Sequence, residues 1–151
     1  MKIRPYKSSD LAEWMRMRRE LWPELPADEE AQRADCDAWL ARDNAIVIVA
    51  QRADSSQLAG FIEVGEREFA DGCETSPVAY LEGWFVDEDV RGQAIGRKLV
   101  QAAEKWAIAN GYREFASDAL LENLPSQRAH NSVGFVEVER AVRYAKQLRN
   151  R

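Results

Sequence analysis

Two arginines and two glycines stand just before a helical pattern in the stretch RGQAIGRK, residues 91–98. Backbone N–H groups in the first turn of a helix have no intrahelical partner, and the peptide dipoles add partial positive charge there. Gly92 and Gly96 let the backbone approach a ligand without a Cβ in the way, while Arg91 and Arg97 supply charge-assisted hydrogen bonds. The combination predicts a phosphate site. The alternative is an ordinary strand-to-helix turn with solvated arginines.

Two familiar phosphate motifs do not fit this stretch. A P-loop has four residues between its glycines and Ser or Thr after its lysine, whereas three residues separate Gly92 from Gly96 and Leu99 follows Lys98. The dinucleotide-binding fingerprint needs a third glycine, which is absent. The stretch therefore belongs to neither class.

The residues on either side of the turn read as strands and helices. Runs rich in β-branched residues at 44–51, 58–67 and 77–87 predict strands, and the polar RADSSQ between the first two suits a hairpin turn. Gly83 interrupts the third run, which indicates a bulge or a close backbone approach. Shorter strands are predicted in MKIRPY and YREFASD, and one or two final strands are predicted in residues 134–146.

Helical spacing predicts four helices. The first begins at a cap within residues 8–10, with Asp10 followed by Glu13 strengthening the start, and Pro23 and Pro26 end it. The second covers residues 28–42, and the candidates for its buried side are Ala31, Ala34, Ala38 and Trp39. The third runs from about Ala94 to Asn110 and stops at Gly111, and a short fourth covers about Ser126 to Val133.

The order β-α-α-β-β-β-α-β-α-β-β predicts an α+β (mixed α/β) fold whose sheet changes from antiparallel to parallel pairing. With 151 residues, 46% of them hydrophobic, we expect a single domain covering 1–151. No run is long enough to span a membrane, and the first residues lack the apolar core of a secretory signal, so a soluble cytoplasmic protein is expected.

Charge and cysteine content narrow the ligand classes. The net charge is −5 and no run of Lys or Arg exceeds two residues, which argues against nucleic acid and favours a cationic ligand. Cys36 and Cys73 form no C-x-x-C pair, so neither metal binding nor redox chemistry is expected.

Two blocks of the sequence resemble the GNAT superfamily of acetyl-CoA-dependent N-acetyltransferases. The family's pyrophosphate loop follows Arg/Gln-x-x-Gly-x-Gly/Ala, and the corresponding residues are Arg91, Gly92, Gln93, Ala94, Ile95 and Gly96. Ala94 replaces the usual glycine. The second block is Asn123, Ser126, His130, Gly134 and Phe135, in which histidine replaces the family's tyrosine.

Longer stretches resemble the aminoglycoside 6′-N-acetyltransferases nearly end to end. They are MRRELWPELP, GCETSPVAYLEGWFV, FASD, ENLPSQRAHNSVGF and EVERAVRYAK. The resemblance implies a central, mostly antiparallel twisted sheet with a splayed parallel strand pair, flanked by about four helices. It also implies a homodimer in which a C-terminal segment helps to complete the neighbouring subunit's site.

The resemblance assigns roles to individual residues. Residues implied in catalysis are Glu82, which holds the substrate amine, Asp118 and His130, which contacts the CoA sulfur or protonates the thiolate. Residues implied in binding the aminoglycoside are Trp22, Asp71, Glu74, Glu82, Asp118 and Glu139. Residues implied in binding acetyl-CoA are Trp84, Phe85, Val86, Arg91, Gly92, Gln93, Ala94, Ile95, Gly96, Arg97 and Asn123. Taken singly, Glu82 also fits a solvent-facing strand carboxylate, Asp118 a turn residue, and Trp22 and His130 packed side chains.

The implied reaction is direct attack of the aminoglycoside 6′-amino group on acetyl-CoA, without a metal and without an acyl-enzyme. Neither cysteine lies in a motif that would activate it as a nucleophile. Acetylation of polyamines or protein amines would use the same parts. A noncatalytic acyl-CoA-binding module is the rival from another class, favoured by Ala94 and by His130 in place of tyrosine.

Overall fold

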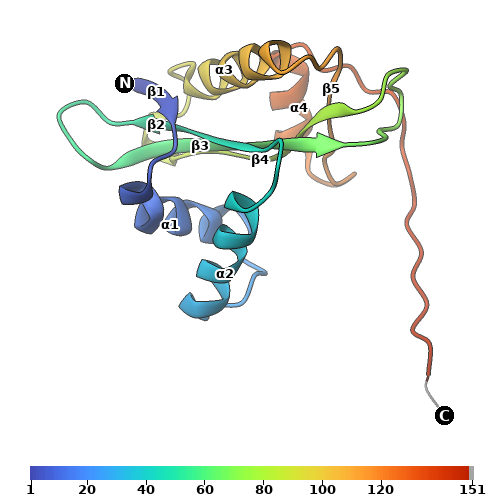
Figure 1. The fold of residues 1–151 in the computed structure, drawn as a ribbon, viewed down its shortest axis with the longest axis horizontal. Helices are drawn as coiled ribbons and strands as arrows, with labels where there is room; N and C mark the ends of the chain where they lie inside the picture. Colours follow the sequence, from blue (N-terminus) through green and yellow to red (C-terminus); the bar gives the residue numbers. More distant parts are fainter. Residues whose placement is uncertain (150–151) are drawn as a thin grey trace. The chain divides into compact units, whose positions relative to one another are not determined.

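The computed structural model describes residues 1–149, drawn as a ribbon in Figure 1. Its strands are β1 (Lys2–Pro5), β2 (Ile46–Gln51), β3 (Leu58–Arg67), β4 (Val78–Val86) and β5 (Phe115–Ser117). Its helices are α1 (Leu11–Leu21), α2 (Glu29–Leu40), α3 (Ile95–Ala109) and α4 (Leu124–Ser132), with 3-10 turns at Ser8–Asp10 and Glu88–Val90. Two compact units divide the chain, Met1–Asp118 and the part from Ala119 onward. The expected domain extends to residue 151, so its last two residues lie outside the described residues.

One sheet is built from the strands of residues 1–118, in the order β1-β2-β3-β4-β5. The first three pairs are antiparallel, whereas β4 and β5 run parallel. Only Ala79–Leu81 pair with Phe115–Ser117, so β4 and β5 part beyond Leu81. The predicted mixed α/β fold with a splayed parallel pair is therefore confirmed.

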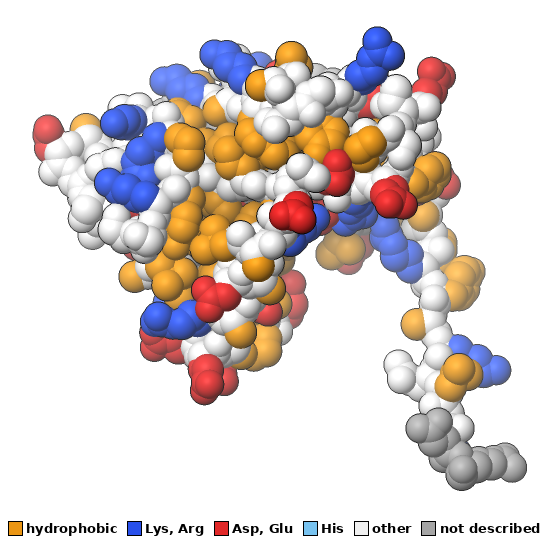
Figure 2. All heavy atoms as spheres, viewed as in Figure 1, with side chains coloured by type: hydrophobic (Ala, Val, Ile, Leu, Met, Phe, Trp, Pro, Cys, Tyr) orange, Lys and Arg blue, Asp and Glu red, His pale blue; other side chains and the backbone are white. Residues whose placement is uncertain are grey.

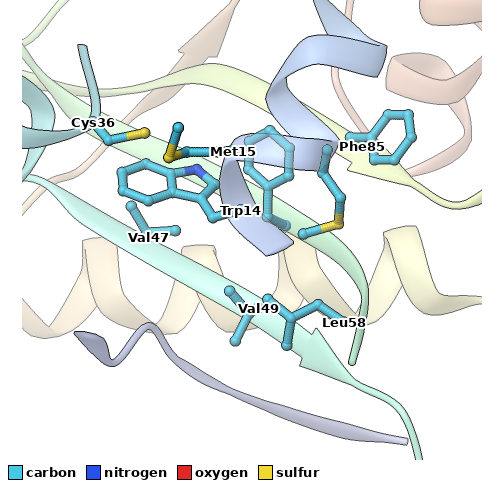
Figure 3. Packing of buried hydrophobic residues seen from close by; sticks show 9 residues of the cluster. Trp14, Met15, Cys36, Val47, Val49, Leu58 and Phe85 are labelled. Atoms are coloured by element: carbon cyan, nitrogen blue, oxygen red, sulfur yellow. The ribbon is translucent and has the colours of Figure 1, made fainter. Parts of the chain in front are cut away.

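Helices cover both faces of this sheet. In Figure 1, α1 and α2 lie on one face and α3 lies on the other. Figure 2 shows hydrophobic side chains filling the space between the layers of α3 and α1. Figure 3 shows the buried cluster in which Trp14 of α1 lies next to Val47 of β2, and Val49 of the same strand lies beside Leu58. Because Trp14 is fully buried, its truncation to alanine should cost about 3–5 kcal/mol.

The start of α1 differs from the expectation. Asp10 makes no side-chain cap bond to this helix. Its carboxylate instead accepts from the backbone N–H of Lys7 at 2.9 Å and from the Arg4 guanidinium at 2.7 and 2.9 Å. Glu13 accepts from the backbone N–H of Leu58 at 3.0 Å. Asp10 is the N-cap residue of α1, within the predicted range, but the predicted side-chain cap was wrong, because the carboxylate binds Arg4 and the N–H of Lys7 at the start of the preceding 3-10 turn. Asp28 does cap α2, accepting from the N–H of Glu30 at 3.0 Å.

The buried side of α2 was also assigned wrongly in part. Ala34 and Ala38 are exposed, and Ala31 and Trp39 are half-buried. Gln32 and Cys36 are buried instead. Gln32 donates to the carbonyl of Pro26 at 2.9 Å, and Cys36 joins the core beside Trp14. Residues 32 and 36 are about one helical turn apart and therefore lie on the same face of α2, which is the buried one. The alanine positions did not indicate this face.

The pattern of α3 is confirmed. Its buried residues are Ile95, Leu99, Val100, Ala103 and Ala107. Trp106 is half-buried and stacks on Tyr112 with ring centroids 5.7 Å apart. Gly111 follows the helix with φ +86°, the left-handed conformation expected for the stop.

The unit from Ala119 onward contains α4, which covers the predicted short helix. The final strands predicted in residues 134–146 were wrong: residues 134–149 contain no strand and run as an extended segment (Figure 1). A strand requires a hydrogen-bonded neighbour, and nothing in the described chain pairs with this one. Its alternating apolar side chains Val136, Val138, Val142 and Tyr144 are exposed, and hydrophobic groups stand out along the segment in Figure 2.

Candidate active site

The β4 strand contains a bulge at Glu82. Gly83 pairs with Glu63 and Leu81 pairs with Val64, which leaves Glu82 as the extra residue on β4. The register with β5 also ends here, at Leu81 and Ser117. Glu82 is therefore placed where the sheet opens, and the irregularity predicted from Gly83 is confirmed one residue earlier in the strand.

Arg67 and Tyr80 connect Glu82 with Asp118. The Nε and Nη2 atoms of Arg67 donate to the two carboxylate oxygens of Glu82, each at 2.9 Å. The Arg67 Cζ atom lies 3.5 Å from the centre of the Tyr80 ring, and the Tyr80 hydroxyl donates to Asp118. Burial, followed by this hydrogen bond, raises the pKa of Tyr80, so the phenol stays protonated near neutral pH. The structure thus brings two predicted acids into one cluster.

Sequence reasoning missed Arg67 and Tyr80. Their positions follow from the pairing of β3 with β4, which aligns Arg67 with Val78 and Gly65 with Tyr80. Alternation along each strand then puts Arg67 and Tyr80 on the same face of the sheet. A charged residue at the end of an apolar strand was the available signal, but it did not identify the partner.

Trp22, at the end of α1, packs against the bulge. A methyl group added at Gly83 would lie 2.7 Å from Cη2 of Trp22. The indole also meets Phe61 edge-on, with centroids 6.5 Å apart, and the Arg18 guanidinium lies 4.7 Å from its ring centre. Trp22 is half-buried, so the structure brings a partly exposed aromatic ring to the strand that carries Glu82.

A second carboxylate, Glu63, lies across from Gly83 and is 1% exposed. It accepts from the Trp14 indole N–H at 2.9 Å and from the Arg18 guanidinium. Burial raises the pKa of Glu63, while Arg18 and Trp14 act in the opposite direction. Sequence reasoning missed this residue too, although an acid inside LAGFIEVGER was a signal of a buried polar group.

The loop before α3 has the features of an anion site. Gly92 has φ +83° and Ala94 has φ +63°, so Ala94 adopts the left-handed conformation that favours glycine. The N-cap residue Ala94 makes no side-chain cap bond to α3, and no acid lies in the first turn of the helix, whereas Arg97 and Lys98 do. Cations are disfavoured at a helix N-terminus unless an anion offsets them. Among residues 91–97, all but Ile95 and Gly96 are exposed.

The end of β4 leads directly to this loop and is held in place by charge. Asp87 accepts from Arg16 of α1 and from Arg52 after β2, each at 3.0 Å. The predicted CoA-binding residues of the strand are Trp84, Phe85 and Val86. The bulge does not free them from β3, because they pair with Ile62, Phe61 and Gly60. The ring of Trp84 packs under α3, where a methyl group at Gly96 would lie 3.2 Å from its Cζ2 atom.

Asp71 and Glu74 lie in the loop between β3 and β4, and both are exposed. Glu114 fixes this loop by accepting from the backbone N–H groups of Glu74 at 2.8 Å and Thr75 at 2.6 Å. The loop is thus ordered by an acid just before β5. Whether Asp71 and Glu74 contact a ligand stays a prediction.

Three further predicted residues belong to the unit from Ala119 onward. Asn123 caps α4 by accepting from the N–H of Ser126 at 3.2 Å. The Nδ1 atom of His130 lies 2.7 Å from the carbonyl of Ser126, so Nδ1 carries the proton in the neutral ring. Glu139 is exposed in the extended segment. Their roles toward substrate or CoA stay predictions.

Neither cysteine is an activated nucleophile. Both are free; burial raises the pKa of Cys36 to about 11 and also raises that of Cys73. No group of three or more metal-ligating side chains occurs within residues 1–149, and no helix in that range is both long and apolar enough to cross a membrane.

The sequence profile of the acetyltransferase (GNAT) family matches residues 11–135. The chain belongs to this family. The match includes both sequence blocks that suggested it, and it extends from the start of α1 past the end of α4.

Relatives of this GNAT chain share one name. It is 40% identical over 147 residues to aminoglycoside N(6′)-acetyltransferase type 1 of Klebsiella aerogenes, covering 97% of this chain and 96% of that protein. The protein of that name from Acinetobacter genomosp. 13 is 38% identical, covering 98% of this chain and 99% of that protein.

Solved structures of similar proteins superpose on nearly the whole chain. AAC(6′)-Ih from Acinetobacter baumannii superposes with a TM-score of 0.89 at 34% identity, covering 97% of this chain and 98% of that one. AAC(6′)-Iy in complex with the bisubstrate analogue CoA-S-monomethyl-acetylneamine superposes with a TM-score of 0.87 at 34% identity, with the same coverage.

Proposed function

We propose that this protein transfers the acetyl group of acetyl-CoA to the 6′-amino group of aminoglycosides. The observation that carries the proposal is the position of Glu82. Glu82 is the extra residue of the β4 bulge, at the point where β5 stops pairing with β4. The C-terminal end of β4 leads to the loop of residues 91–97, which we call the anion-type loop. Relatives named for this activity at 40% and 38% identity support the proposal.

In this proposal the loop of residues 91–97 holds the CoA diphosphate. The positive φ angles of Gly92 and Ala94, the uncapped start of α3 and the basic first turn all suit a phosphate ligand. Trp84, Phe85 and Val86 are assigned to the rest of the cofactor, along the edge of β4 that β5 does not pair with beyond Leu81. Asn123 is assigned to the same ligand. Acetyl-CoA, when bound, supplies the acetyl group as a thioester.

The amine binds at the bulge in the middle of β4. Glu82 and Asp118 offer carboxylates to ammonium groups, and Trp22 offers an aromatic face beside them. Asp71, Glu74 and Glu139 are assigned to the remaining amines of a polycationic sugar. An acid-rich site of this kind matches the net charge of −5.

The amine attacks directly in a complex with both substrates. The raised pKa values of both cysteines support the absence of an acyl-enzyme. The main role of Glu82 is to orient the amine, and it also relays the proton of the amine, directly or through water. His130 can donate to the departing thiolate only from its charged form or from Nδ1, because Nδ1 carries the proton of the neutral ring. A thiolate is a tolerable leaving group with a reference pKa of about 8.5, so such an acid is dispensable.

We further infer one cytoplasmic GNAT domain over residues 1–151, acting as a homodimer. The family profile crosses the boundary between the two compact units, which supports a single domain. Two free thiols suit a reducing compartment. The exposed apolar side chains that alternate between Val136 and Tyr144 are typical of a strand in need of a partner, which favours pairing with a second chain. Light scattering that gives a monomer mass would contradict the dimer.

The test of the proposed reaction is thiol release. Purified protein with acetyl-CoA and kanamycin should release free thiol, and mass spectrometry should place the acetyl group on the 6′-nitrogen. Turnover of spermidine or peptides without turnover of aminoglycosides would favour an acetyltransferase of polyamines or protein amines. CoA binding without thiol release from any amine would favour the noncatalytic module.

A further inference from the structure

Arg67 holds the carboxylate that the proposed function gives to the substrate amine. Its Nε and Nη2 atoms each donate to a different oxygen of Glu82 at 2.9 Å, which is the bidentate geometry that fixes a carboxylate in one plane. The guanidinium in turn stacks on Tyr80, with 3.5 Å between Cζ and the ring centre. Tyr80 is fixed by its hydrogen bond to Asp118. The arginine is therefore held from two sides.

The pair remains accessible. The side chain of Glu82 is 24% exposed and that of Arg67 is 43% exposed. An ionised carboxylate offers about four acceptor positions, and a bidentate arginine uses two of them. A substrate ammonium can therefore bind Glu82 while Arg67 stays in place.

Acetyl transfer requires the neutral amine, and an isolated carboxylate opposes its formation. A negative charge beside an ammonium stabilises the protonated form, so a bare Glu82 would bind the substrate well and deprotonate it poorly. A guanidinium on the same carboxylate offsets that charge. It also leaves the remaining acceptor positions of the carboxylate open to the amine.

Other charges near Glu82 do not supply this offset. The charged and titratable groups that interact directly with Glu82 are Arg67, Tyr80 and Glu63. Arg18 and Asp118 are reached through Glu63 and Tyr80, respectively. Arg18 is already paired with the buried Glu63. Tyr80 stays neutral and Asp118 is a further acid. Arg67 is the cation in contact with Glu82 among these groups.

We propose that Arg67 is a positioning residue that orients Glu82 and offsets its charge, so that a cationic substrate is bound without being locked in its protonated form. This inference rests on the proposed function, because it takes an amine as the ligand of Glu82. It predicts that Arg67 affects the acid side of the pH profile rather than the maximal rate.

The test compares wild-type protein with Arg67→Gln in single-turnover acetylation of kanamycin at saturating substrates. Single-turnover rates exclude product release, and rates in the ternary complex report the groups ionising there. The acid limb reports protonation of the bound substrate amine. Removing the Arg67 cation should raise the pKa of that amine, so the acid limb of Arg67→Gln should lie about one unit higher in pH than that of the wild type. At pH values below the limb, the single-turnover rate of Arg67→Gln should be about tenfold lower than that of the wild type. On the high-pH plateau the two rates should agree within about twofold.

Two control variants separate charge from structure. Arg67→Lys keeps the cation but loses the bidentate contact, so its limb should stay near that of the wild type. Arg33→Gln removes an exposed arginine that pairs with Glu29 on α2, away from the site, and should leave the profile unchanged. The shift produced by Arg67→Gln should also persist in a His130→Ala background, which removes the histidine as the source of the limb.

The outcomes distinguish this inference from the proposed function. An active wild type whose profile superimposes on that of Arg67→Gln, or a plateau that falls while the limb stays in place, overturns the role of Arg67 alone. A wild type that acetylates no aminoglycoside at any pH overturns the proposed function and this inference with it. Equal melting temperatures and CoA affinities in the two proteins would establish that the compared chains are folded.

Discussion

Two carboxylates on neighbouring strands of the sheet are built into similar groups. Glu63 on β3 is bound by Arg18, whose guanidinium lies 5.6 Å from the Trp14 ring centre and 4.7 Å from that of Trp22. Glu82 on β4 is bound by Arg67, whose guanidinium lies on Tyr80. Each group consists of an acid, an arginine and the aromatic side chains beneath that arginine, two in the first group and one in the second. We refer to them as the Glu63 group and the Glu82 group.

The two groups differ in their access to water. Glu63 is 1% exposed, and burial raises its pKa. Glu82 is the unpaired residue of the bulge, at the point where β5 leaves β4. The same side-chain chemistry therefore gives a sealed support beneath Trp22 in one case and an accessible binding group in the other. The bulge, rather than the residue types, makes the difference.

Replacing Glu82 tests the comparison most severely. Glu82→Gln keeps the size of the side chain and removes the charge and the proton acceptor. If Glu82 orients the amine and accepts its proton, kcat/KM for kanamycin should fall about 100-fold or more. The affinity for CoA should not change, because the loop of residues 91–97 follows the end of β4, whereas Glu82 lies at the bulge in the middle of that strand. Steady-state kinetics and calorimetric titration with CoA measure the two quantities, and unchanged kinetics would remove Glu82 from the site.

Breaking the Glu63 group should act on stability instead. Arg18→Met leaves a buried carboxylate without its cation, which should cost about 3–5 kcal/mol in the free energy of unfolding. The matched control is Arg33→Met, at an exposed pair on α2, which should cost less than about 1 kcal/mol. Thermal unfolding of the three proteins gives the comparison, and equal losses in the two variants would mean that burial does not distinguish these pairs.

The cost of Arg18→Met should depend on pH with a definite sign. The pKa of Glu63 is raised above the ordinary 4.5, so the folded state binds the proton more tightly than the unfolded state. The stability that Glu63 contributes through this proton is therefore fully present below pH 4.5, and it is lost as pH rises through the pKa of Glu63 in the folded state. Without Arg18 the pKa of Glu63 in the folded state rises further, so the variant should lose more stability than the wild type as pH rises above the ordinary value of 4.5. A smaller loss would contradict this assignment.

Local patterns in the sequence predicted much of the frame around these groups. The apolar spacing of α3, the left-handed stop at Gly111 and the bulge beside Gly83 all follow from residues close together in the chain. Such features depend on backbone sterics and on one-sided burial, which short windows record. The resemblance to a known family indicated Glu82 and Asp118.

The partners of those acids could not be predicted in the same way. Arg67 and Glu82 are 15 residues apart in the sequence, and Arg18 and Glu63 are 45 residues apart. Both contacts depend on the strand register and on where α1 lies, and alternation identifies a strand without naming its neighbour. The prediction of the final strands was wrong for a related reason. Val136 and Val138 have the alternating pattern of a strand, but no strand in the described chain pairs with this segment.

A methyl group at Gly83 should disturb both groups moderately. In Gly83→Ala the new Cβ would lie 2.7 Å from the Trp22 ring and 3.5 Å from Oε2 of Glu63. Overpacking of this kind costs about 1–3 kcal/mol, and the displaced indole should raise KM for kanamycin several-fold while KM for acetyl-CoA stays constant. Gly65→Ala is the control, because its methyl would meet only the flexible end of Arg42 at 2.6 Å. Equal effects from the two substitutions would argue against Trp22 as a substrate contact.

Glu63→Gln should have the smallest effect and completes the comparison with Glu82→Gln. The amide oxygen still accepts from the Trp14 indole and from Arg18, so the cost in unfolding free energy should be about 1 kcal/mol. Because Glu63 is sealed from substrate, kcat/KM for kanamycin should change less than about threefold. The variant should also lose the part of the pH dependence of stability that Glu63 supplies. A loss of activity as large as that of Glu82→Gln would mean that the buried acid takes part in the reaction, and burial would then no longer separate the two groups.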